Sequence, residues 1–273
     1  MAEMRAAVAA PLDGARIAAI CGAADVETVL RTGSTNTDLL GRFRAQAPQR
    51  PLLLAALEQT QGRGRSGGAW HAAPGSALLF SLAIPLAGPR SIDGAVSLAC
   101  GLAAAEALAP LAAIALQWPN DLLLDGRKLG GVLCELALDG AGQRTLIAGV
   151  GINLWLTPEE RVAIARPAAA LDERVAQEQL VAQRDVLIGA IAAATCTVVG
   201  ELDAHGFSAL RARFLARFAL LGREVEVLEA KHPIAAGIAV DIDAAGRLLL
   251  RTETGTRAFA GGAVSLRIAA RPA

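Results

Sequence analysis

Two arginines stand inside a glycine-rich segment near residue 60, and their setting points to anion chemistry. The segment reads EQTQGRGRSGGAW over residues 58–70 and places Arg63 and Arg65 among four glycines. Planar guanidinium groups match carboxylate and phosphate oxygens, and glycine lets the main chain approach a ligand closely. We therefore expect a loop that binds an anionic ligand. The alternative is a surface loop whose arginines are only solvated.

The same segment contains a literal G-x-G-x-x-G over residues 62–67. A dinucleotide-binding fingerprint should open a helix and be followed, about 20 residues on, by an acidic residue at the end of the next strand. Here Gly68 and Pro74 block the helix, and the next apolar run leads into a Pro-Arg pair at 89–90. We therefore reject a Rossmann-type site.

A second polar group lies between two short apolar runs. Pro119 pre-sets a turn there, and Asn120 and Asp121 occupy it, which is a common position for a site. Lys128 follows shortly before Gly131, in a chain that has only two lysines among its 26 basic residues. A flexible ammonium can follow charge as it moves between a carboxylate and a phosphate. The alternatives are a plain turn and a solvated lysine.

A third group closes a buried apolar run and reads Gly149, Gly151 and Asn153. Glycines in a strand can mark a ligand lying against the backbone, and an Asn side chain can hold a hydroxyl or a phosphate. A bulge followed by a turn-forming Asn explains the same pattern and stays open.

The apolar spacing predicts the elements that must position these residues. Strands are expected over residues 26–30, 52–57, 78–84, 114–118, 122–124, 129–138 and 146–150. Helices are expected from the caps at 34–36 through 38–43, over 91–108, ended by Pro110, and over 177–202. We expect no regular element over 62–68, a loop with one helical turn over 158–170, and one helical face carrying Phe207, Leu210, Phe214 and Phe218.

After Gly222 the pattern changes to short runs separated by Gly, Asp and Pro. The five expected strands cover residues 225–228, 234–240, 248–251, 256–259 and 264–268. They predict a small β-barrel at the C-terminal end.

Composition limits the class of protein. The chain has 273 residues, 53% of them apolar, and 26 Lys or Arg against 26 Asp or Glu. This argues against disorder and against nonspecific phosphate binding, which needs a basic excess. The four cysteines lack metal-ligand spacing and predict a reduced, cytosolic protein without zinc. The apolar stretch 95–116 predicts a buried helix rather than a membrane span, and the N-terminus is a poor signal peptide.

In this order the segments resemble one family, the biotin protein ligases, also called biotin–[acetyl-CoA-carboxylase] ligases. The resemblance rests on EQTQGRGRSGGAW, on WPND followed by GRKLGGVLCE, on GVGIN and on the Ser-Thr-Asn at 34–36, and it spans about residues 26 to 268. It implies an α+β fold with a mixed, largely antiparallel sheet flanked by helices, like that of class II aminoacyl-tRNA synthetases, and a C-terminal SH3-like barrel. The expected division is an N-terminal extension over 1–25, a catalytic domain over 26–220 and the barrel over 221–273.

The resemblance also implies a two-step reaction. The biotin carboxylate attacks the α-phosphate of MgATP to give biotinyl-5′-AMP, and a lysine of a biotin carboxyl carrier protein domain then takes the biotinyl group. By resemblance, Arg65 and Lys128 are the catalytic residues. The residues expected to bind biotin are Ser34, Thr35, Asn36, Gln59, Arg63, Gly64, Arg65, Lys128, Gly131, Gly149 and Gly151. Those expected to bind ATP are Arg63, Trp70, Asn120, Asp121 and Asn153, with Asp121 also expected on magnesium.

Two features depart from the family pattern. Gln117 stands where the family usually has a lysine before its W-P-N. The 33 residues before Ser34 carry no helix-turn-helix pattern, so we expect a monofunctional ligase without a DNA-binding domain, acting in the cytoplasm without nucleic acid or membrane. A lipoate or octanoyl ligase and a biotin sensor without turnover are the rival readings. The sequence leaves monomer and homodimer both open.

Overall fold

The computed structural model describes residues 8–88, 94–164, 167–230, 232–261 and 264–268. A seven-stranded sheet forms the centre of a larger body, in the order β1-β2-β3-β7-β6-β5-β4. Its strands are β1 (Asp25–Thr32), β2 (Leu52–Gln59), β3 (Ala77–Leu86), β4 (Ala115–Gln117), β5 (Asp121–Leu124), β6 (Arg127–Leu138) and β7 (Arg144–Asn153). Only the β1–β2 pair is parallel, which confirms the predicted mixed and largely antiparallel sheet.

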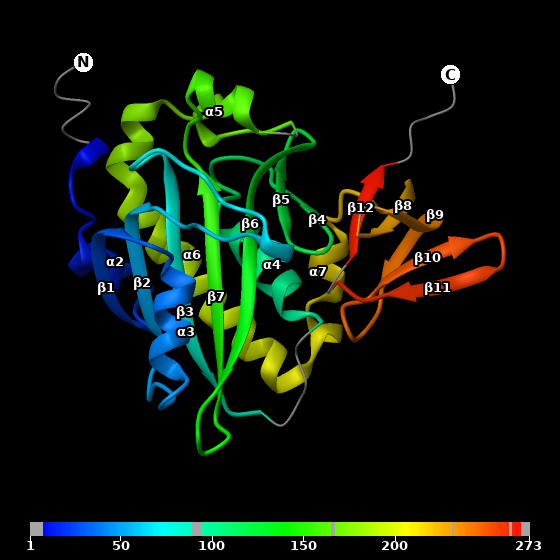
Figure 1. Ribbon diagram of the computed structural model, residues 1–273, viewed down its shortest axis with the longest axis horizontal. Coiled ribbons are helices and arrows are strands. Elements are labelled where there is room, and N and C mark those ends of the chain that lie inside the picture. The colour runs from blue at the N-terminus through cyan, green and yellow to red at the C-terminus, as the bar shows by residue number, and fades with distance from the viewer. Residues whose placement is uncertain (1–7, 89–93, 165–166, 231, 262–263, 269–273) are drawn as a thin grey trace.

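Helices cover both faces of this sheet. The α-helices are α2 (Gly14–Cys21), α3 (Thr35–Phe43), α4 (Val96–Ala107), α5 (Pro158–Ala163), α6 (Gln177–His205) and α7 (Arg211–Leu215). The short 3-10 helices are η1 (Arg65–Gly67), η2 (Leu171–Glu173) and η3 (Phe207–Ala209). In Figure 1, α3 lies in front of the sheet, and α4 and α6 lie behind it. Leu54 of β2 packs on the α3 side and Leu53 in the main core, which explains the unbroken apolar run of this strand.

Two apolar helices form the centre of the main core. The buried helix predicted in the stretch 95–116 is α4, whose alanines let it lie close to α6 and to β6. Among the described residues, α6 is the one helix long and apolar enough to cross a membrane, by length and composition alone. It packs against α2, α4 and β3 and carries the buried Arg184, as expected of the core helix of a globular protein.

The C-terminal sheet contains the five predicted strands. They are β8 (Glu224–Glu229), β9 (His232–Ile242), β10 (Leu248–Thr252), β11 (Gly255–Phe259) and β12 (Val264–Ile268), all antiparallel, in the order β11-β10-β9-β8-β12. This C-terminal sheet lies beside the edge of the body that carries β4 (Figure 1). The indole N–H of Trp118 donates to the Gly246 carbonyl at 3.0 Å, and that carbonyl belongs to the β9–β10 turn.

Several local predictions were wrong. The strand expected to end near Val150 continues to Asn153, because β3 and β6 pair with β7 on both sides through its glycines. The glycine-rich loop contains η1, which Gly67 allows with a φ of +76°. Helix α2 was not predicted at all. The four aromatic and apolar residues expected on one helix are all buried, but they are shared among η3, α7 and the segments beside them. The first residues of the helix expected over 91–108 lie outside the described residues.

Candidate active site

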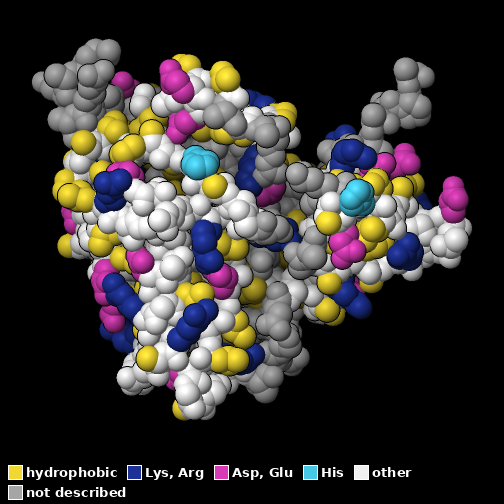
Figure 2. Space-filling model, in the orientation of Figure 1, with side chains coloured by type: hydrophobic (Ala, Val, Ile, Leu, Met, Phe, Trp, Pro, Cys, Tyr) yellow, Lys and Arg dark blue, Asp and Glu magenta, His cyan; other side chains and the backbone are white. Residues whose placement is uncertain are grey.

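A pocket of about 570 Å³ opens between the central sheet, the glycine-rich loop and the C-terminal sheet. Figure 2 shows a recess between the larger body and the C-terminal sheet, with cationic and acidic side chains on its walls. Every predicted site residue except Asn153 lines this pocket. Three sequence segments far apart in the chain therefore meet in one cavity. Asn153 is buried behind it, and its amide donates to the Ala169 carbonyl at 3.0 Å.

The start of α3 supplies a neutral polar wall. Ser34 caps the helix by accepting from the Thr37 amide, which leaves the next residues buried at the helix start. The side-chain carbonyl of Gln59, at the end of β2, accepts from the Thr35 amide at 2.8 Å. The hydroxyls of Thr35 and Ser81 lie 2.6 Å apart and share a hydrogen bond. This wall offers hydrogen bonds without net charge, which suits a neutral polar ring.

Asn36 ties this wall to β6. Its side-chain carbonyl accepts from the Ser81 hydroxyl at 2.6 Å, and its amide donates to the Leu133 carbonyl at 3.1 Å and to the Glu135 carboxylate at 2.9 Å. A Cβ on Gly149 would lie 2.3 Å from the Asn36 Oδ1 atom. The close approach at Gly149 is therefore made by a side chain of the protein itself, where the sequence had suggested a ligand.

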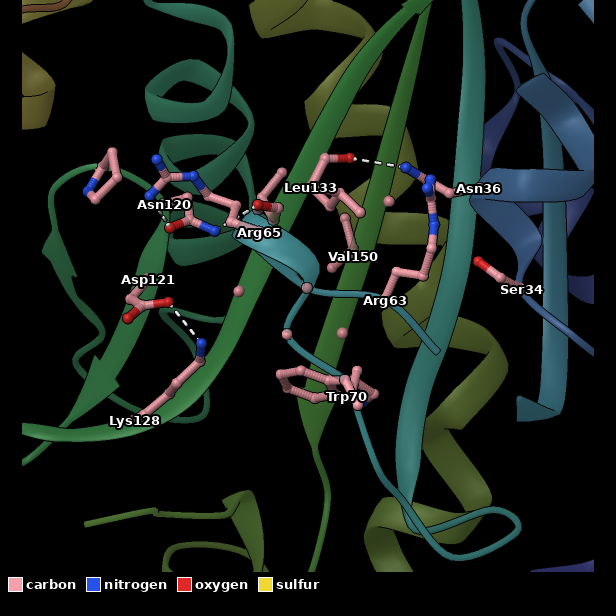
Figure 3. A pocket seen from close by; sticks show the side chains of 18 of the residues that line it. Ser34, Asn36, Arg63, Arg65, Trp70, Asn120, Asp121, Lys128, Leu133 and Val150 are labelled. Carbon is pink, nitrogen blue, oxygen red and sulfur yellow. Dashed lines mark hydrogen bonds and ion pairs between the residues drawn. The ribbon is translucent and has the colours of Figure 1, made fainter. Parts of the chain in front are cut away.

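The glycine-rich loop folds back on itself and sends its two arginines to opposite walls of the pocket (Figure 3). The Trp70 amide donates to the Gly62 carbonyl at 2.8 Å, so the loop closes as a small hairpin. Arg63 donates to the Glu135 carboxylate. Arg65 donates to the Asn120 side chain at 3.4 Å and to the Gly261 carbonyl of the C-terminal segment. Burial lowers the pKa of the Arg65 guanidinium, and the Asp121 carboxylate opposes that shift.

Lys128 and Asp121 face each other across the opposite end of the pocket. The Lys128 Nζ atom lies 2.7 Å from the Asp121 Oδ1 atom, and the two side chains are 22% and 11% exposed. The same ammonium stands 5.7 Å from the centroid of the Trp70 ring. Trp70 lies against Gly151, where a Cβ would come within 2.8 Å of the indole. The buried indole N–H of Trp70 has no hydrogen-bond partner among the described residues.

Sequence reasoning missed part of the site. Ser81 is fully buried and central to the polar wall, and its signal was a lone serine within the apolar run of β3. Glu135 was visible only as a charged residue inside a strand. Ala230, Val264 and Leu266 of the C-terminal sheet also line the pocket, and nothing in their sequence indicated this.

Comparison with known proteins gives consistent matches. Residues 29–153 match the biotin/lipoate A/B protein ligase family, and residues 220–267 match the biotin protein ligase C-terminal domain. A biotin–[acetyl-CoA-carboxylase] ligase of Mycobacterium tuberculosis is 35% identical over 266 residues, 92% of each chain. Its counterpart in Paracoccus denitrificans is 31% identical over 82% of this chain and 93% of that protein. The structure of an Aquifex aeolicus biotin protein ligase in complex with biotin and ATP superposes with a TM-score of 0.71, at 25% identity, covering 89% of this chain and 99% of that one.

Proposed function

Because the chain belongs to the biotin protein ligase family, we propose that its pocket holds biotin along the neutral wall at α3 and ATP along the end that carries Asn120 and Asp121. The protein is an ATP-dependent ligase that activates biotin as biotinyl-5′-AMP and transfers it to a lysine of a biotin carboxyl carrier protein domain. The observation that carries the residue roles is the single cavity that joins a neutral polar wall to three cationic side chains, Arg63, Arg65 and Lys128.

In the first step the biotin carboxylate oxygen bonds to the α-phosphorus of ATP, the bond from that phosphorus to the β-phosphate oxygen breaks, and diphosphate leaves. The step joins two anions, so positioned cations and exclusion of water lower its barrier most. We assign this role to Arg65 and Lys128, which approach the pocket from the loop and from β6. Arg63 and Gly64 belong to the loop that covers the two substrates.

For the biotin ring system we propose Ser34, Thr35, Asn36 and Gln59 as the surrounding wall. Their mutual hydrogen bonds hold them in place before a ligand arrives, which lowers the entropy cost of binding. We further propose that Trp70 faces the adenine with its ring. The position of Trp70 in the pocket lining supports this proposal. We also propose that Gly131, Gly149 and Gly151 lie beside the ligands, with Gly149 making room for Asn36 and Gly151 for Trp70.

Magnesium accompanies ATP as a co-substrate ion. Such an ion commonly takes one or two carboxylates and fills its remaining positions with water and phosphate oxygens. Among the described residues that line the pocket, Asp121 is the acidic one, and no group of three or more His, Cys, Asp or Glu side chains lies together in the described chain. The residues fit an ion held mainly by the nucleotide. Asp121 would supply one carboxylate, and the ion would neutralise phosphate charge.

In the second step a neutral lysine ε-amine of the carrier domain bonds to the biotinyl carbonyl carbon. The bond from that carbon to the phosphate oxygen breaks, AMP leaves, and one amine proton passes to water. No nucleophile of this chain is needed, and the described residues that line the pocket include neither Cys nor His.

We also propose a division into a catalytic domain over 26–220 and a C-terminal domain over 221–273, with residues 1–25 as an extension whose α2 packs on α6. The four free cysteines support a cytoplasmic protein, and the zero net charge supports one that works without nucleic acid. The packing of α6 supports a protein that works without a membrane. Monomer and homodimer remain alternatives for sedimentation to decide.

The function is tested by transfer of radiolabelled biotin to a carrier domain in the presence of MgATP, beside parallel reactions with radiolabelled octanoate and lipoate. We expect labelling that needs both biotin and ATP. Labelling by lipoate alone would move the chain to the lipoate ligases. ATP-independent biotin binding without transfer would make it a sensor, the reading that Gln117 favours.

A further inference from the structure

A continuous line of hydrogen bonds crosses the site from the expected biotin wall to the glycine-rich loop. In order, its members are Gln59, Thr35, Ser81, Asn36, Glu135 and Arg63. Four of these six residues belong to the predicted biotin wall and loop. Glu135 connects its two neighbours in this line, because its Oε2 atom accepts from both the Asn36 amide and the Arg63 guanidinium.

Glu135 does not itself line the pocket. It lies on β6, beside the Asn36 amide and under the Arg63 side chain. A carboxylate in this position repels an anionic substrate but attracts the loop arginine. Its role must therefore act through Arg63 and Asn36 rather than on the reacting atoms.

The first half of the loop is held on two sides. Arg63 reaches Glu135 on one wall, and Arg65 reaches Asn120 and the Gly261 carbonyl on the other. Gly64 alone separates the two arginines, so these contacts fix one short stretch of the loop. The side chains of Arg63 and Glu135 are 42% and 26% exposed. An ion pair with this exposure favours the closed position of the loop only modestly, so the loop can still open.

We propose that Glu135 is a positioning residue that latches Arg63, and with it the loop, across the biotin end of the pocket, so that the activated intermediate stays bound until the carrier lysine arrives. This inference rests on the proposed function for the identity of the intermediate. Water hydrolyses the mixed anhydride. An intermediate that leaves the pocket before the carrier lysine arrives is therefore lost to transfer. The shared contact with Asn36 connects the latch to the wall that biotin occupies.

The test replaces Glu135 by Gln, which keeps an oxygen that can accept from Asn36 but removes the charge that holds Arg63. In the ligand-free protein, amide hydrogen exchange over residues 62–70 should become about two- to fivefold faster, the factor expected for loss of a partly exposed ion pair. The ratio of AMP released to biotin transferred should rise by a similar factor, while KM for biotin stays within about twofold. Glu135→Ala should raise the same ratio and also KM for biotin, because the Asn36 amide then keeps only the Leu133 carbonyl of its two acceptors.

Glu106→Gln is the matched control. Glu106 pairs with Arg213 at 28% and 41% side-chain exposure, close to the values of the Glu135 pair, and it lies outside the pocket. It should change neither the exchange of the loop nor the ratio. Unchanged exchange and ratio in Glu135→Gln would overturn the latch. A wild-type protein that transfers no biotin would instead overturn the proposed function, and hydrogen exchange would still decide on the latch.

Discussion

Lys128 illustrates how much of this site depends on pairs of side chains. Its ammonium is held between the Asp121 carboxylate and the Trp70 ring, so it is positioned before any substrate binds. A preorganised cation costs no reorganisation when charge develops on a carboxylate or phosphate oxygen. The sequence indicated Lys128 through its rarity, but its partners became visible only when β5 and β6 were paired.

Lys128→Ala should lower the rate of adenylate formation by about 10²- to 10³-fold, the usual cost of removing one preorganised group that stabilises transition-state charge. Biotin-dependent exchange of labelled diphosphate into ATP measures this step without a carrier. Arg42→Ala is the control, since Arg42 forms an exposed ion pair outside the pocket. Full exchange activity in Lys128→Ala, with normal folding by circular dichroism, would remove Lys128 from the catalytic step.

Gly149→Ala tests the polar wall. The added Cβ would meet Asn36 Oδ1 at 2.3 Å, so Asn36 must move and its bonds to Ser81 and Glu135 must weaken. We expect a loss of about 1–3 kcal/mol in the free energy of unfolding and a rise of about tenfold in KM for biotin, measured by denaturant titration and steady-state kinetics. In Gly140→Ala the new Cβ meets nothing within 4 Å, so both quantities should stay near wild type. Equal KM values in the two variants would contradict the assigned role of Asn36.

At the scale of elements, the sequence pattern predicts those strands and helices whose formation depends on neighbouring residues in the chain. The buried strands and α3 with its Ser34 cap follow from apolar runs and capping chemistry. The continuation of β7 through Gly149 and Gly151 does not, because it depends on two neighbouring strands. The hairpin of the loop likewise depends on Trp70 reaching back to Gly62. The motif residues of the pocket were therefore predictable, whereas Ser81, the lining from the C-terminal part and the mutual contacts were not.

Residues 167–173 form hydrogen bonds with the first two residues of β6. The Lys128 amide donates to the Pro167 carbonyl, and Arg127 donates to the Glu173 carboxylate of η2. The bond from Arg127 lowers the pKa of Glu173. A carboxyl with a lowered folded-state pKa stabilises the protein above its unfolded pKa and loses that contribution as pH falls through the folded value.

Glu173→Gln should therefore lower the free energy of unfolding by about 0.5–1 kcal/mol at pH 7, a value kept small because Arg127 is 35% exposed and solvent screens the pair. The difference from wild type should shrink below about pH 4.3, where Glu173 takes up a proton in the unfolded chain, and vanish below its lowered folded-state pKa. Urea titrations across this range measure it. Glu253→Gln, in an exposed turn, should show no such dependence, and a gap that persists at pH 3 would argue against the ion pair as its source.

At the scale of the whole molecule, one core joins the body to the C-terminal sheet. Buried residues of both parts, such as Leu116, Val225 and Leu250, belong to the same hydrophobic cluster. The outer edge of β4 is bonded by residues 217–219, which lead into the C-terminal sheet. The pocket takes its lining from both parts, so the position of the C-terminal sheet affects the nucleotide end of the site.

Trp118 links the larger body to the C-terminal sheet, because its indole N–H donates to the Gly246 carbonyl. Asn120, two residues later, lies in the pocket wall. Trp118→Phe leaves that carbonyl without its donor and should lower the free energy of unfolding by about 1–3 kcal/mol. It should also raise KM for ATP more than KM for biotin, since the Asn120 end of the pocket loses its support and the α3 wall does not. Trp155→Phe makes the same replacement of indole by phenyl at a buried position outside the pocket. It should lower the free energy of unfolding without raising KM for ATP. If both variants changed KM for ATP equally, the change would follow from lost stability. The hydrogen bond from Trp118 to Gly246 would then have no specific effect on the nucleotide end of the pocket.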